Sequence, residues 1–98
     1  MPRALFPLGQ IAATPGAHFL MEDLDLSWIT FIARHQTGDW GDVCDDDKRE
    51  NSLSVRNGTR ILSAYEVGPA VEGKKRSRLW VLTEADRSFT TILLPEEY

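Results

Sequence analysis

The chain has 98 residues, which is enough for one domain with a single modest core and too few for two. Hydrophobic residues make up 42% of the sequence and charged residues 27%, a balance typical of folded globular proteins that excludes wholesale disorder. The net charge of −4 argues against nucleic acid as a partner, because an acidic protein does not attract a phosphate backbone through its overall field.

The charge is unevenly distributed along the chain. Residues 1–50 hold nine acidic and four basic side chains, whereas residues 51–98 hold six and seven. Four of the basic side chains lie within Lys74–Arg78, a cluster that we interpret as a solvated loop able to touch an acidic partner.

The sequence predicts a cytoplasmic protein. Its single cysteine, Cys44, excludes an internal disulfide and fits a reducing compartment. No apolar run approaches the roughly 18 residues of a transmembrane helix. The N-terminus also lacks the apolar core of a signal peptide, so no membrane association is expected.

The first elements in chain order are a short strand and a short helix. Residues 5–13 are typical of an edge strand, because Pro7 cannot donate a hydrogen bond to a ladder. The following Thr-Pro-Gly predicts a helix start, and the helix is expected over residues 15–22 with Phe19 and Leu20 facing inward.

The clearest helical pattern covers residues 28–36, with Ser27 as its cap and Gly38 ending it in the left-handed conformation. Its spacing predicts one buried stripe with two flanking positions: Trp28, Ile29, Ile32 and Ala33, flanked by Phe31 and His35. A third, partly exposed helix is expected to reach Arg56, with Asp45 or Asp46 as its cap and Asn57-Gly58 as its end.

The rest of the chain is typical of β-structure. Thr59–Val67 alternates between two faces, residues 68–77 form a loop, and Arg78–Glu84 and Ser88–Leu94 predict a tight hairpin ended by Pro95. The order β-α-α-α-β-β-β therefore predicts a single α+β domain over residues 1–98. Two to three helices are expected to pack on one face of an antiparallel sheet of three to four strands.

The segment from His35 to Asp47 is the densest in polar groups. His35, Asp39, Asp42 and the aspartates 45–47 could be imagined as metal ligands, yet their spacing fits neither an EF-hand loop nor a zinc site. We favour turn and helix-cap roles for these side chains, and expect no metal and no cofactor.

Trp40 lies between two Gly-Asp pairs, Gly38-Asp39 and Gly41-Asp42. Such a tryptophan either fills the core from a loop or presents an aromatic face to a partner. The core role is favoured, but a binding site would be centred on the following residues: Trp40, Asp39, Asp42, Asp86 and Arg87.

The hairpin tip offers an alternative, enzymatic hypothesis. Glu84 and Arg87, together with His35 and Tyr65, could supply an acid/base pair and a cation for a phosphate, as in small ribonucleases. A hairpin turn whose backbone is hydrogen-bonded by Asp and Ser side chains has much the same sequence as such a catalytic set. The sequence therefore favours a non-catalytic protein over a hydrolase.

Nearly the whole chain resembles a family of small uncharacterised bacterial proteins that are labelled plasmid-related and carried on plasmids and integrative elements. The resemblance rests on five stretches: Leu5–Ala17, His35 with Gly38–Asp42, Arg60–Tyr65, Trp80–Ser88 and Leu93–Tyr98. It implies a setting in mobile DNA and no particular chemistry. We therefore expect a small accessory protein, monomeric or homodimeric, that binds another protein, such as a component of a host-defence or transfer system.

Overall fold

The computed structural model describes residues 3–98, and their elements follow the predicted order β-α-α-α-β-β-β. The predicted α+β class is thereby confirmed, and a short 3-10 turn that the sequence pattern did not show follows the last strand. The elements are β1 (Gln10–Ala13), α1 (Pro15–Asp23), α2 (Trp28–Gln36), α3 (Asp45–Asn57), β2 (Ile61–Val67), β3 (Ser77–Thr83), β4 (Phe89–Leu93) and η1 (Pro95–Glu97).

The first two helices begin where local capping chemistry predicts. The Thr14 hydroxyl accepts the Ala17 amide at 3.3 Å, and the Ser27 hydroxyl accepts the Ile29 amide at 3.3 Å. Each bond satisfies a backbone N–H that has no partner within its own helix. None of the helices within residues 3–98 combines the length and the apolar composition needed to cross a membrane.

The third helix begins slightly earlier than predicted. Cys44 occupies the cap position without a side-chain hydrogen bond, so Asp45 and Asp46 lie in the first turn, where they face the positive end of the helix dipole. The helix ends at Gly58, whose φ of 72° is the left-handed conformation that favours glycine.

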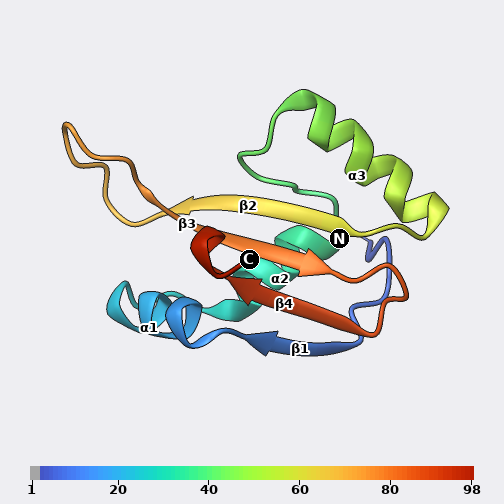
Figure 1. Ribbon diagram of the computed structural model, residues 1–98, viewed down its shortest axis with the longest axis horizontal. Coiled ribbons are helices and arrows are strands. Elements are labelled where there is room, and N and C mark those ends of the chain that lie inside the picture. Colours follow the sequence, from blue (N-terminus) through green and yellow to red (C-terminus); the bar gives the residue numbers. More distant parts are fainter. Residues whose placement is uncertain (1–2) are drawn as a thin grey trace.

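The four strands form one sheet in the order β1-β4-β3-β2 (Figure 1). β2, β3 and β4 are antiparallel neighbours, but β1 runs parallel to β4, with Gln10 opposite Phe89 and Ala13 opposite Ile92. The prediction of a purely antiparallel sheet was therefore wrong, and the sheet is mixed. The alternation of a strand sets its buried face, but it does not set the direction in which a distant strand pairs with it.

Two helices cover one face of the sheet, and the third lies along the border formed by β2 (Figure 1). The main core joins α1 and α2 to the inner face of the strands, and its buried members are Ala17, Met21, Phe31, Ile32, Tyr65, Val67, Leu79, Val81 and Ile92. A smaller cluster beside α3 contains Phe6, Trp40 and Ile61.

The buried stripe of α2 is displaced toward its C-terminus from the predicted one. Trp28 and Ile29 are 47% and 59% exposed, whereas Phe31, Ile32 and His35 are buried. The same spacing fits both sets of residues: Phe31 and Ile32 of the second set pack in the main core, and the sheet supplies polar partners that allow His35 to be buried beside them. In α1, Phe19 is likewise 62% exposed, because Ala17 and Met21 face the sheet in its place.

Candidate functional site

His35 is a core residue joined to a buried chain of hydroxyl groups. Its Nδ1 lies 2.6 Å from the Ser63 hydroxyl, and its Nε2 lies 2.9 Å from the Thr83 hydroxyl. Thr83 in turn contacts the Thr90 hydroxyl at 2.7 Å, and Thr90 donates to the carbonyl of Leu8 at 2.8 Å. The side-chain polar atoms of this buried network all have partners, so the network links α2 to the three strands β2, β3 and β4 and leaves no ring nitrogen for a ligand.

Burial, together with the smaller effect of the nearby positive charge of Arg87, lowers the pKa of His35 to about 3. The ring is therefore neutral at physiological pH and acts as one donor and one acceptor. A neutral, fully enclosed imidazole cannot exchange a proton with a substrate.

Two other members of the enzymatic hypothesis, Tyr65 and Arg87, are also tied to the scaffold, whereas Glu84 contributes its backbone amide and carbonyl to the hairpin tip. Tyr65 is fully buried, its hydroxyl donates to the carbonyl of Asp39 at 2.6 Å, and burial raises its pKa to about 12. The Arg87 guanidinium donates to the backbone carbonyls of Thr59 and Ser54 at 2.7 and 2.8 Å. Arg87 thus holds the hairpin tip against the end of α3, and the geometry gives no support to a His35-centred hydrolase.

Trp40 lies in the smaller core cluster and is only 6% exposed. Its indole stacks on Phe6 with centroids 6.3 Å apart and meets the edge of His35 at 6.0 Å. The structure therefore places Trp40 in the core role that the sequence favoured, and its aromatic face is not available to a partner.

The aspartates beside Trp40 satisfy backbone groups and a neighbouring arginine. Asp39 pairs with Arg34 at 2.6 Å, and this hydrogen bond lowers the pKa of the Asp39 carboxyl. Asp42 accepts the amide of Glu66 at 2.7 Å. Between them, Gly41 forms a parallel bridge to Ala64, an approach so close that a Cβ at Gly41 would lie 2.1 Å from the Ala64 carbonyl oxygen.

The remaining predicted site residue, Asp86, closes the β3–β4 turn. Its Oδ1 accepts the backbone amide of Ser88 at 3.0 Å and the Ser88 hydroxyl at 2.6 Å. Within residues 3–98, no group of three or more His, Cys, Asp or Glu side chains is arranged to hold a metal ion. The predicted site residues are therefore dispersed over the core, the β2 border and the hairpin tip.

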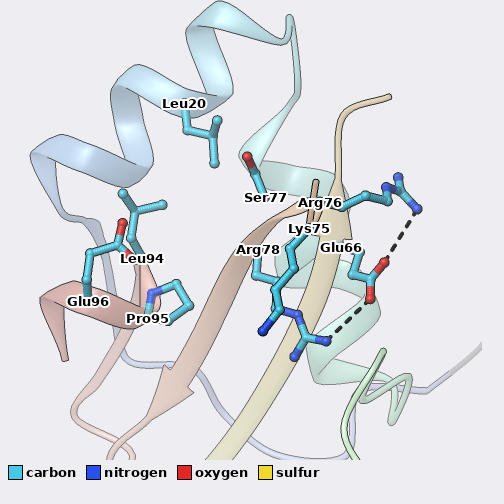
Figure 2. Close-up of a pocket in the computed structure, with 9 residues that line it drawn as sticks. All are labelled: Leu20, Glu66, Lys75, Arg76, Ser77, Arg78, Leu94, Pro95 and Glu96. Atoms are coloured by element: carbon cyan, nitrogen blue, oxygen red, sulfur yellow. Dashed lines mark hydrogen bonds and ion pairs between the residues drawn. The ribbon is translucent and has the colours of Figure 1, made fainter. Parts of the chain in front are cut away.

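A different surface has the geometry of a binding site. A half-open cleft of about 770 Å³ lies at the end of the sheet where β2 finishes and β3 begins, and Figure 2 shows its walls. It is lined by residues from α1, β2, the β3 entry and the C-terminal turn: Leu20, Glu66, Lys75, Arg76, Ser77, Arg78, Leu94, Pro95 and Glu96.

The two sides of this cleft differ in chemistry. Leu20, Leu94 and Pro95 form an apolar wall on one side, with Glu96 beside it, and the basic side chains stand opposite them (Figure 2). The volume falls within the range of roughly 300–1,000 Å³ that is typical of ligand sites, which combine apolar walls with a few convergent polar groups. The cleft therefore suits a ligand that carries both an aliphatic group and a negative charge.

The basic side is held in place by its own contacts. Glu66 lies between two arginines, 3.3 Å from Arg78 Nη2 and 3.8 Å from Arg76 Nη1. Arg76 also donates twice to the Gly68 carbonyl, from Nε at 3.1 Å and from Nη2 at 2.7 Å. These contacts reduce the conformational entropy that the side chains would lose on binding a ligand.

The sequence pointed to only part of this cleft. Four bases within Lys74–Arg78 marked a cationic segment, but nothing local indicated that Leu20 and Leu94 would face it. Comparison with models of protein families, with curated proteins and with solved structures found no match to the chain. The functional conclusion therefore rests on the geometry of the chain itself.

Proposed function

We propose that the chain is a non-catalytic interaction protein that binds an acidic segment of another protein in the cleft between α1, η1 and the start of β3. The observation that supports this proposal is the concentration of basic side chains opposite an apolar wall in a protein with a net charge of −4. An acidic side chain of the partner would lie on the basic side, and an aliphatic one would pack on the wall.

The lining of the cleft holds three basic side chains, Lys75, Arg76 and Arg78, against two acidic ones, Glu66 and Glu96, and this excess favours an anionic ligand. Glu66 neutralises only one of the two arginines that it contacts, and within residues 3–98 no ion pair engages Lys75. Both arginine side chains keep more than a third of their surface exposed, so their remaining N–H groups can reach a carboxylate. The cleft is also half open, and a peptide crossing it needs less enclosure than a small molecule, whose surface is usually mostly buried.

The sequence resemblance to plasmid-related proteins gives this proposal a biological setting. In that setting the acidic segment would belong to a component of a host-defence or transfer system. The setting rests on the resemblance, whereas the binding chemistry rests on the cleft.

Fluorescence anisotropy with labelled ten-residue peptides tests the proposal. A peptide of alternating Leu and Glu should bind, and the same peptide with Lys in place of Glu should not. Lys75→Glu, at a lining position, should weaken binding by roughly tenfold or more, the effect of reversing one charged contact.

Lys74→Glu is the matched control, because Lys74 is adjacent, does not line the cleft and changes the net charge equally. If the two variants weakened peptide binding equally, the effect would come from the overall charge of the protein, and the proposed site would be contradicted. Equal binding of the Glu and Lys peptides, or displacement of the Glu peptide by single-stranded DNA, would contradict the proposed ligand.

A further inference from the structure

The two border strands of the sheet differ in whether their outward backbone groups are hydrogen-bonded. Along β2, three residues turn their backbone groups away from β3: Leu62, Ala64 and Glu66. The Asn51 side chain accepts the Leu62 amide at 3.1 Å and donates to the Leu62 carbonyl at 2.7 Å.

The same border is closed further along by the loop around Gly41. The Ala64 amide donates to the Trp40 carbonyl at 3.2 Å, and the Ala64 carbonyl accepts the Asp42 amide at 2.6 Å. The Glu66 amide donates to the Asp42 carboxylate. No further strand can therefore pair with β2 without first displacing these groups.

At the opposite border, no further strand within residues 3–98 pairs with β1 (Figure 1). The Gln10 and Thr14 amides donate to carbonyls on the β4 side, so alternation turns the amides and carbonyls of Ile11 and Ala13 outward. Within residues 3–98 no side chain hydrogen-bonds to either residue, and all four residues of β1 are exposed. β1 also contains no proline, charge or bulge, the devices that normally protect an edge strand.

We infer that β1 is a homodimer interface, in which the β1 strands of two copies pair antiparallel about a twofold axis at Ala12. In this register Ile11 of each copy faces Ala13 of the other, and both residues offer an outward amide and carbonyl. The pairing forms four backbone hydrogen bonds and joins two four-stranded sheets into one of eight strands.

The lack of charged residues and the small side chains at this border favour pairing with a second copy over pairing with a foreign strand. No Asp, Glu, Lys or Arg occurs from Ala4 to Met21 or in β4, so two copies can meet here without like charges facing each other despite the net charge of −4. Ala12 would face Ala12 of the second copy, and these small side chains permit close approach. Ile11, 41% exposed in one copy, would be covered by the other.

Sedimentation equilibrium of the full chain over a range of concentrations tests the inference. The average mass should rise from 11.1 kDa toward twice that value, and the Ile11 and Ala13 amides should gain protection from hydrogen exchange as it rises. Ala13→Pro removes an outward N–H that has no partner in the monomer, so it should keep the fold and weaken dimerisation at least tenfold.

Ala13→Lys provides a second test should Pro disturb the strand, and Val71→Lys is its control. Val71 is exposed in the β2–β3 loop and receives the same charge, so only Ala13→Lys should remain monomeric. A chain that stays monomeric at roughly millimolar concentration would overturn the inference. A dimer unaffected by both Ala13 variants would also overturn it, as would protection of Ile11 and Ala13 that appears only when an extended foreign peptide is added.

Discussion

Acidification should destabilise the fold through His35, because this buried ring takes up a proton at a much lower pH in the folded protein than in the unfolded chain. Its pKa is about 3 in the fold and 6.5 in an ordinary histidine. A group whose folded pKa is depressed contributes its full stability above the unfolded pKa, and that stability is lost as the pH falls from 6.5 toward 3. At about pH 5 the unfolded chain has gained most of one proton, which lowers the free energy of unfolding by about 2 kcal/mol relative to pH 7.

Urea unfolding followed by tryptophan fluorescence at the two pH values measures this loss. The free energy of unfolding of the wild-type chain should fall by about 2 kcal/mol, while that of His35→Gln, which starts less stable but has no imidazole at position 35, should fall much less. His18→Gln is the matched control: it removes the other imidazole, an exposed one beside Glu22, and should retain the wild-type loss. A wild-type loss below about 0.5 kcal/mol, or the same loss in His35→Gln, would refute the reasoning.

Three substitutions test the packing around the sheet. Trp40→Ala should lower the free energy of unfolding by about 3–5 kcal/mol in urea titrations, the range for removing a buried aromatic side chain; a loss below 1 kcal/mol would contradict its core role. Gly41→Ala should cost about 1 kcal/mol or more and speed hydrogen exchange of the Ala64 amide, because the new Cβ would collide with the Ala64 carbonyl. Glu97→Gln should lower the melting temperature of the chain by a few degrees, since the Glu97 carboxylate accepts the Gly16 amide at the start of α1; an unchanged melting temperature would show that this contact is dispensable.

Features governed by neighbouring residues could be predicted from the sequence. Thr14 and Ser27 cap their helices as expected, and Gly58 ends α3, because each effect acts within one turn of helix. The alternation of β2 also predicted its faces, with Ile61 and Tyr65 both buried on the helix side.

Features that depend on distant partners could not be predicted. The parallel pairing of β1 depends on β4, and the burial of His35 depends on Ser63 and Thr83. The cleft combines side chains from four separate parts of the chain, of which only the basic cluster has a local signal. Residue spacing indicates which side of a helix or strand is buried, whereas these features depend on which other element packs against that side.

The dependence of the first elements on the last ones has a consequence during synthesis on the ribosome. β1 and α1 are made first, yet β1 pairs with β4, and the Thr14 hydroxyl and Gly16 amide at the start of α1 donate to Glu97. Such long sequence separations delay folding, because the intervening chain must be closed into a loop before the contacts form. A nascent chain that stops before β4 therefore exposes the apolar N-terminal segment to chaperones and proteases, and the first elements become native only when the last have been synthesised.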